Sequence, residues 1–215
     1  MQEDNLVKQA LSLISEEGQL SEWFATVKFI LKALDMEEYF LDSSVITTNQ
    51  FTNICSKRLH KLLIKQWKTA ISSNFSNNGR NNKLRFYSRI KASFEMEPYL
   101  DNVNDFNMRK AICKFRCSDH QLEIEKGRHN NLNVEERICQ VCNSGIESEM
   151  HFLAKCPLYE PLRNRYFESN QESALINLLK CSDKTTAFNI GNYIMKAMKL
   201  RKDTLILQST EESTE

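Results

Sequence analysis

Four residues with metal-binding side chains lie within a short stretch of this sequence, in the order Cys139-x2-Cys142-x8-His151-x4-Cys156. Two cysteines separated by two residues can hold one ion between them, and a later histidine and cysteine can complete a tetrahedral set of sulfur and nitrogen donors. Zinc is the ion that proteins bind with such donors at such spacing. The pattern therefore predicts a Zn2+ site on these four residues.

The residues between the donors favour this arrangement. Asn143, Ser144 and Gly145 supply turn-forming residues directly after the first pair. Pro157 disfavours a helical conformation at Cys156, so His151 can lie on a short helix with Cys156 just beyond its end. Four protein donors leave no open coordination position, which predicts a structural ion. The alternative is three ordinary thiols and an unrelated histidine.

Residues 134–160, which we call the knuckle, contain few large apolar side chains. We therefore expect the metal to supply much of their folding free energy, on the order of 10 kcal/mol for structural zinc at neutral pH. The rest of the chain has helical periodicity. The predicted fold class is mainly α: a helical protein with a small embedded zinc knuckle and little or no β structure.

Composition places the chain among globular proteins, with 41% hydrophobic and 27% charged residues. No hydrophobic run indicates a signal peptide or a membrane-spanning helix. Seven cysteines, an odd number, fit a reducing compartment better than a secreted disulfide framework. We expect an intracellular protein, nuclear or cytoplasmic, without a membrane partner.

Charge is distributed unevenly along the chain. Residues 1–42 have a net charge of −6, whereas residues 43–94 contain ten bases and no acid. Such a basic block can neutralise phosphates, which predicts salt-dependent binding of nucleic acid. The alternatives are a solvated helix face or pairing with the acidic segment. The candidate nucleic-acid-binding residues, which include two arginines near the knuckle, are Lys57, Arg58, Lys61, Lys65, Lys68, Arg85, Arg89, Arg128 and Arg137.

Apolar periodicity and breaker residues predict how the chain is divided. Helices are expected at Leu6–Ile14, from about Ser21, over Asn49–Ser72, from Asn104, over Leu158–Phe167 and Ala174–Leu179, and after a cap at Ser182 or Asp183. The expected segments are a helical N-terminal region (1–73), a linker (74–82), a helical region (83–133), the knuckle (134–160), C-terminal helices (161–202) and a disordered acidic tail (203–215).

Two further patterns allow more than one interpretation. Aromatic residues alternate with bases between Lys83 and Phe94, and they can form core or stack on bases of a single strand. Cys113, Cys117 and His120 share nearly one helical face, which would suit a second metal site, although no fourth donor is evident.

A longer set of motifs resembles the C-terminal region of non-LTR (LINE-like) retrotransposon reverse transcriptases. It spans roughly residues 83–166, and its most specific part is C-x2-C followed by E-x-E-x-H-F-L-x2-C-P. The motifs are Arg109-Lys110-Ala111, Phe115-Arg116-Cys117, Leu122-x-Ile124-Glu125-x-Gly127-Arg128-His129, Glu136-Arg137-x-Cys139-x2-Cys142, Ile146-Glu147 and His151-Phe152-Leu153-x2-Cys156-Pro157-Leu158-Tyr159. The resemblance implies a zinc knuckle that helps to hold RNA or target DNA, with Cys139, Cys142, His151 and Cys156 as the ligands.

The sequence also departs from that family. It contains no Asp-Asp dipeptide, so it lacks the aspartate pair with which a polymerase palm holds two metal ions. No endonuclease acid cluster and no Ser/His/Asp set is evident. The function expected is therefore binding of RNA or single-stranded DNA without catalysis. The alternative is a protein-interaction scaffold with a purely structural zinc site, and an enzyme is the third possibility.

Overall fold

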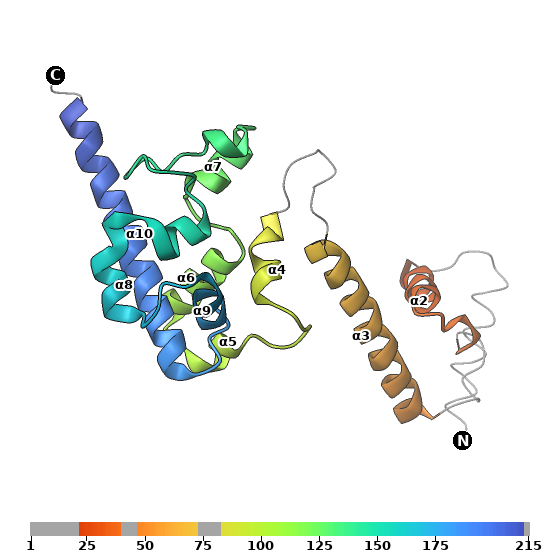
Figure 1. The fold of residues 1–215 in the computed structure, drawn as a ribbon. Helices are drawn as coiled ribbons and strands as arrows, with labels where there is room; N and C mark the ends of the chain where they lie inside the picture. The colour runs from red at the N-terminus through yellow and green to blue at the C-terminus, as the bar shows by residue number, and fades with distance from the viewer. Residues whose placement is uncertain (1–21, 40–46, 73–82, 213–215) are drawn as a thin grey trace. The chain divides into compact units, whose positions relative to one another are not determined.

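The structure is a computed structural model, and it describes residues 22–39, 47–72 and 83–212 (Figure 1). The helix expected at Leu6–Ile14 and the linker expected at 74–82 lie outside the described residues. The fold is mainly helical, as predicted. Within the described ranges the β structure is limited to one isolated antiparallel bridge between Ile138 and Ile146. No helix in these ranges is both long enough and apolar enough to cross a membrane.

The chain divides into two compact units, residues 1–66 and 67–215. The first unit contains α2 (Glu22–Ala33), η1 (Glu37–Tyr39) and most of α3 (Thr48–Ser72). Its small core consists of Leu31, Leu34 and Met36, against which Phe51 and Ile54 of α3 pack. Both helices begin close to where the apolar periodicity placed them. The boundary between the units lies inside α3 and not in the segment 74–82.

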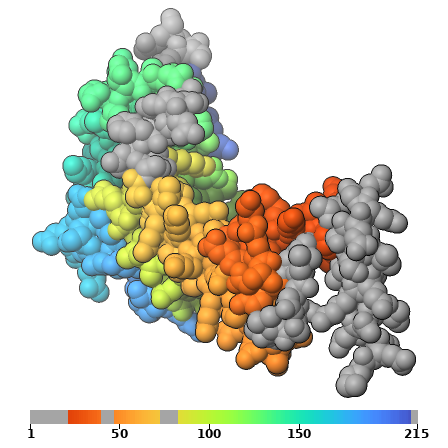
Figure 2. Space-filling view, turned by 90° about the vertical axis from the view of Figure 1, so that its right-hand side faces the viewer, coloured from red at the N-terminus to blue at the C-terminus, as the bar shows by residue number. Residues whose placement is uncertain are grey.

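The second unit consists of short helices around one long helix. Its elements are η2 (Lys83–Arg85), α4 (Tyr87–Ile90), α5 (Pro98–Asn102), α6 (Phe106–Arg116), α7 (Glu123–His129), η3 (Val134–Glu136), η4 (His151–Lys155), η5 (Pro157–Tyr159), α8 (Glu160–Tyr166), α9 (Glu172–Leu178) and α10 (Lys184–Glu212). Segments far apart in the sequence lie side by side: atoms near residue 90 adjoin atoms near residue 170, where α4 meets α9 (Figure 2). The segments expected at 83–133, 134–160 and 161–202 thus share one core.

Side-chain caps begin the two helices that organise this unit. The Asp105 carboxylate accepts a hydrogen bond from the backbone N–H of Met108 (2.7 Å) at the start of α6. Asp183 does the same for Thr186 (2.8 Å) at the start of α10. Each cap satisfies a backbone donor that the first turn leaves unpaired. For α10 the sequence predicted a cap at Ser182 or Asp183, and the structure has it at Asp183.

The tail expected at 203–215 is different in the structure, because α10 continues to Glu212. The residues in question, Leu205-Ile206-Leu207-Gln208, are mostly good helix formers, and adding a turn to an existing helix costs little. Ser/Thr and acid content was a poor guide here. The prediction of disorder is wrong for residues 203–212, and residues 213–215 lie outside the described part.

Aromatic rings form the centre of the core, and the knuckle supplies two of them. Phe152 lies 5.3 Å from Phe115, 4.7 Å from Tyr159 and 5.6 Å from Tyr193, measured between ring centroids. Phe86 packs edge-on against Phe115 at 5.8 Å and is buried. The aromatics after Lys83 were expected either to form core or to stack on nucleic-acid bases, and Phe86 forms core.

Helix α6 packs closely against α10 at Gly191. A β-carbon added to Gly191 would lie 2.3 Å from Cγ of Met108 and 3.3 Å from Cδ1 of Ile112. Two non-bonded carbon atoms do not approach to the shorter distance, so a larger residue would force the Met108 side chain or its helix to shift.

We predict that Gly191→Val destabilises the protein by roughly 1–3 kcal/mol through overpacking, measured by urea denaturation. Lys199→Val is the matched control, because it introduces the same β-branched side chain at an exposed position of the same helix. Equal stability of the two variants would contradict the close approach.

Candidate metal centre

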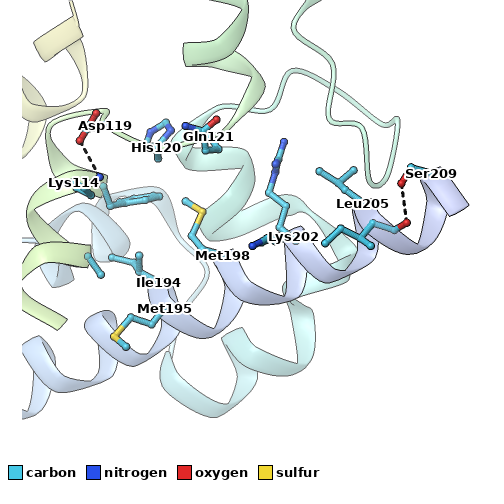
Figure 3. Close-up of a pocket in the computed structure, with 14 residues that line it drawn as sticks. Lys114, Asp119, His120, Gln121, Ile194, Met195, Met198, Lys202, Leu205 and Ser209 are labelled. Carbon is cyan, nitrogen blue, oxygen red and sulfur yellow. Dashed lines mark hydrogen bonds and ion pairs between the residues drawn. The ribbon is translucent and has the colours of Figure 1, made fainter. Parts of the chain in front are cut away.

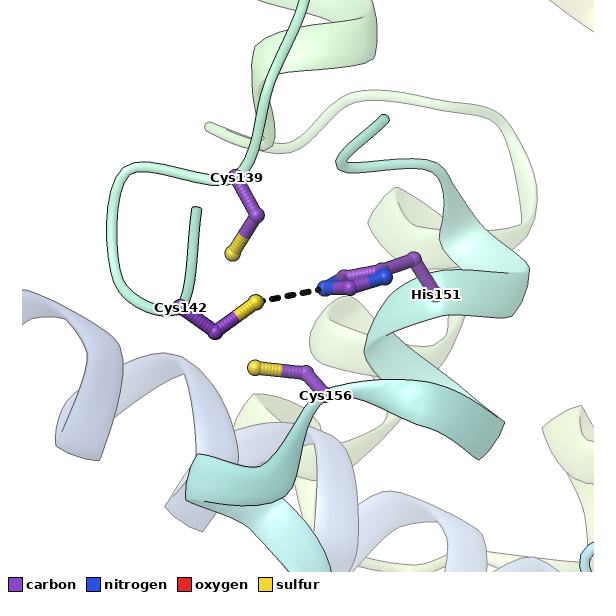
Figure 4. A group of neighbouring side chains, drawn as sticks. All are labelled: Cys139, Cys142, His151 and Cys156. Atoms are coloured by element: carbon purple, nitrogen blue, oxygen red, sulfur yellow. Dashed lines mark hydrogen bonds between the residues drawn. The ribbon is translucent and has the colours of Figure 1, made fainter. Parts of the chain in front are cut away.

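The four predicted ligands come together at one point (Figure 4). Cys139 and Cys142 lie on the turn between Arg137 and Glu147, His151 begins η4, and Cys156 follows its last residue. Cys156 is extended, with φ −61° and ψ 125°, and Pro157 starts η5. The backbone therefore turns between the third and fourth donors as the sequence predicted.

The turn between the first pair and His151 is held by backbone hydrogen bonds. The N–H of Asn143 donates to the carbonyl of Cys139 (2.9 Å), and the N–H of Cys139 donates to the carbonyl of Gly145 (2.9 Å). Asn143 has φ +52°, a left-handed conformation that asparagine adopts more readily than most residues. The chain thus reverses directly after Cys142, where turn-forming residues were expected.

The donor atoms have the separations that one ion requires. The three sulfurs and the imidazole nitrogen all lie within 4.8 Å of one another, and Cys142 Sγ is 3.3 Å from His151 Nε2. With metal–sulfur bonds of about 2.3 Å, a tetrahedral site has donors roughly 3.8 Å apart, so a small contraction would close the shell. Cys139, His151 and Cys156 are buried and Cys142 is partly buried. The cluster is suited to a metal with soft and borderline ligands, above all zinc.

Hydrogen bonds around the sulfurs suit thiolates. The backbone N–H groups of Val141 and Cys142 act to lower the pKa of the Cys139 thiol, and that of Leu158 acts to lower the pKa of the Cys156 thiol. Among the four side chains themselves, the hydrogen bond with Cys156 raises the pKa of Cys139 to about 12, and the same bond lowers the pKa of Cys156. The hydrogen bond with Cys139 raises the pKa of His151. Metal binding would displace these shared protons.

The other cysteines do not assemble a second centre. Within residues 22–39, 47–72 and 83–212, the four-residue cluster is the one group of three or more Cys, His, Asp or Glu that could hold an ion. His120 turns to Glu149 (Nε2 to Oε1, 3.2 Å) and not toward Cys113 and Cys117. All seven cysteines are free thiols. The second metal site considered from the sequence is therefore not formed.

Directly behind the cluster lies a buried ion pair. The Glu147 carboxylate, which has no exposed surface, receives hydrogen bonds from Nε and Nη2 of Arg201 on α10, both at 2.7 Å. Its second oxygen also accepts from the backbone N–H of Glu123 (2.8 Å), and its first lies 3.7 Å from the Cys139 sulfur. A guanidinium fork of this kind holds a carboxylate in one orientation. Arg201 thus connects α10 to the residue next to the first ligand.

A second buried carboxylate anchors the other side of the knuckle. Glu149 accepts hydrogen bonds from Ser118 (2.8 Å) and Arg85 (2.9 Å) and contacts His120. Burial raises the pKa of Glu149, but the hydrogen bond to His120 and the charge of Arg85 outweigh it and lower the pKa to about 2. Neither acid has a role that was predicted from the sequence. The signal available in the sequence is their position, because two glutamates two residues apart lie just before His151. Acids in a segment that becomes buried must be paired with cations or hydrogen-bond donors.

Of the four arginines of the second unit that were candidates for nucleic-acid contact, three are used inside the protein. Arg137 is 6% exposed, and its guanidinium donates to the carbonyls of Leu132 (2.7 Å) and Ile124 (2.9 Å). Arg85 binds Glu125 and Glu149, and Arg128 binds Glu125 (2.8 Å). Arg89 is half-exposed but pairs with Glu172. The expectation that Arg137 contacts nucleic acid does not fit its burial, since its donors are satisfied by the protein's own backbone.

The candidates on α3 are placed differently. Lys57, Lys61, Lys65 and Lys68 are exposed, and no residue of α3 is fully buried. Within the described residues, Lys57, Lys61 and Lys68 take part in no ion pair. Arg58 is the exception on this helix, because it donates to the backbone carbonyls of Leu34 (2.9 Å) and Asp35. The basic block of the sequence therefore divides into an exposed part on α3 and an internally paired part after residue 83.

Comparison with family models, with curated proteins and with solved structures finds no match to this chain. The resemblance to retrotransposon reverse transcriptases therefore stays a prediction.

We predict that Cys139→Ser and His151→Ala each abolish stoichiometric metal binding and remove the loss of stability that a chelator causes in the parent protein. The reason is that only three protein donors remain, so water, a much weaker ligand, must fill the fourth position and the ion is held too weakly to survive purification or to stabilise the fold. Metal content by mass spectrometry and thermal melting with and without chelator are the measurements. Cys181→Ser is the control, because Cys181 is equally buried but is not part of the cluster. A chelator-sensitive His151→Ala variant would refute the ligand set.

We predict a strong coupling between Glu147 and Arg201. Arg201→Met leaves a buried carboxylate without its partner and costs about 3–5 kcal/mol, whereas Glu147→Leu/Arg201→Met recovers part of that loss. Urea denaturation of the two single variants and the double variant gives the interaction free energy. Additive losses would show that the pair is not coupled.

Proposed function

We propose that this chain is a non-catalytic nucleic-acid-binding protein in which a structural Zn2+ holds the knuckle, and that its binding surface is the basic face of α3. The observation that carries the proposal is the exposed lysine series on that helix. The resemblance to the C-terminal region of retrotransposon reverse transcriptases supports the same function, with RNA or single-stranded DNA as the ligand.

The lysines of α3 form one stripe. At about 100° per residue, Lys57, Lys61, Lys65 and Lys68 fall within a sector of roughly 80°, and successive members are about 4.5–6 Å apart along the axis. All four are exposed. A row of cations at this spacing is suited to successive phosphates of a strand, and each phosphate it neutralises would release counterions.

Internal partners of the arginines support a smaller set of nucleic-acid contacts than the sequence predicted. Because Arg85, Arg128 and Arg137 bind internal partners, they belong to the proposed scaffold and not to the proposed surface. Arg58 holds the turn after α2. The proposed contacts are therefore Lys57, Lys61, Lys65 and Lys68, with Arg89 at most a minor contributor because of Glu172.

The zinc in this proposal has no catalytic role. Catalytic zinc needs a position for water or substrate, whereas the cluster offers four protein donors, three of them buried. When bound, the ion would cross-link the Cys139–Cys142 turn to η4. The surrounding residues do the rest: Glu147 and Glu149 attach the knuckle to α10 and to the segment around Arg85.

A protein-interaction scaffold is the second candidate, and one observation favours it. Four bases of the acid-free block form ion pairs with acids elsewhere in the same unit. The pairs are Lys83 with Asp119, Arg85 with Glu125 and Glu149, Arg89 with Glu172, and Lys91 with Glu97. This pairing removes part of the positive charge that nucleic acid would need. The scaffold candidate predicts weak nucleic-acid binding whatever happens to α3.

We predict that replacing Lys57, Lys61, Lys65 and Lys68 together by Gln weakens binding of single-stranded RNA and DNA and lowers the slope of log K against log salt by up to about 3, from ~0.7 per phosphate contact. Fluorescence anisotropy over a series of salt concentrations measures both quantities. The matched control replaces four other exposed lysines, Lys110, Lys180, Lys184 and Lys199, which gives the same net charge. An equal effect of both sets would indicate net charge alone, and salt-independent binding would reject the proposal.

A further inference from the structure

A groove of about 550 Å³ runs along α10 on the side that faces the end of α6 (Figure 3). Its wall is mostly apolar: Phe115, Ile194, Met195, Met198, Leu205 and Ile206. The α10 residues that line it extend from Ile194 to Ser209, which is about 22 Å of helix at 1.5 Å per residue. The groove is thus as long as four helical turns.

The end of α10 is unusually apolar for a helix that extends past α6 and α8 (Figure 1). Ile206 is 50% exposed and Leu207 is 63% exposed. In most proteins a helix is stabilised by packing of its apolar face and not by propensity alone. Exposed aliphatic residues beside an apolar groove are typical of an interaction surface.

One charge in the groove lacks a partner within the described residues. Lys202 is exposed and takes part in none of their ion pairs, although it lies between Met198 and Leu205 on the same stripe. The other two cations there are already paired, Lys114 with Asp119 and Arg201 with Glu147. An occupant that fits this surface therefore needs an acidic group flanked by apolar ones.

We propose that the groove docks an amphipathic helix of a partner protein, whose apolar side chains at i, i+3 or i+4, and i+7 fill it and whose Asp or Glu faces Lys202. A helix laid beside two helices buries its apolar stripe over several turns, and the length of the groove matches such a stripe. The proposal is independent of nucleic-acid binding, because it uses no residue of α3.

The experiment is a selection from a displayed library of 18-residue peptides with fixed leucines at helical spacing and random flanking positions, carried out on the full zinc-loaded chain. We expect enriched peptides to carry Asp or Glu beside the leucine stripe. In fluorescence anisotropy, Ile206→Arg should weaken their binding about tenfold or more, as removal of a central interface anchor does.

Two variants make the selection specific. Leu207→Arg places the same charge on the neighbouring exposed residue, which does not line the groove, and should change affinity less than about twofold. Lys202→Glu should reverse the preference from acidic to basic peptides. Circular dichroism checks that each variant keeps its helix content.

Several results would overturn the proposal. One is a selection that enriches no peptide, and another is equal weakening by Ile206→Arg and Leu207→Arg. An acidic preference that survives Lys202→Glu would remove the charge argument. Sedimentation that shows a dimer which Ile206→Arg dissociates would assign the groove to a second copy of this chain instead.

Discussion

The pairing of buried Glu147 with Arg201 is the interaction on which the second unit depends. A buried carboxylate is unfavourable unless a cation matches its charge, and the matching guanidinium comes from α10, 54 residues later in the chain. Because the carboxylate also accepts from the backbone of Glu123, one residue joins the knuckle, α7 and the long helix. Glu149 does the same toward Ser118, His120 and Arg85. The two glutamates before the ligand histidine are therefore what turns a small metal loop into part of a larger core.

The same requirement divides the basic residues into two groups. Arg85, Arg128 and Arg137 are used as internal donors to acids or to backbone carbonyls, for which the planar guanidinium is well suited. Lysines on α3 remain at the surface, since a flexible ammonium is strongly hydrated and gains little from burial. Counting charge along the chain treats both groups alike. Their chemistry and their burial separate the proposed scaffold from the proposed nucleic-acid surface.

Local patterns predicted much of the fold. The helices at Glu22–Ala33 and Thr48–Ser72, and the cap at Asp183, follow from periodicity and capping chemistry, which act over one or two turns. The four-residue cluster follows from donor type and spacing. The helical end at 203–212 was not predicted, because the acidic residues of the tail favoured disorder more strongly than the short run of helix-forming residues at 205–208 favoured a helix. The packing of Phe152 and Tyr159 in the main core was not predicted either, since a knuckle with few large apolar side chains was expected to depend on its metal for stability.

The amino-acid sequence alone determined the helical class, the four residues of the candidate metal cluster and the segment where positive charge gathers. These depend on residue type and on spacing over a few positions. Tertiary structure decided which charges are available, because the partners of Arg85, Arg137 and Glu147 are brought to them by the folded chain and not by neighbouring residues. It also decided that α6 and α10 leave an apolar groove open beside Lys202. Long-range pairing of buried groups leaves no periodic pattern in a single sequence. This is the physical reason why the helices and the cluster could be predicted from the sequence but the ion pairs and the groove could not.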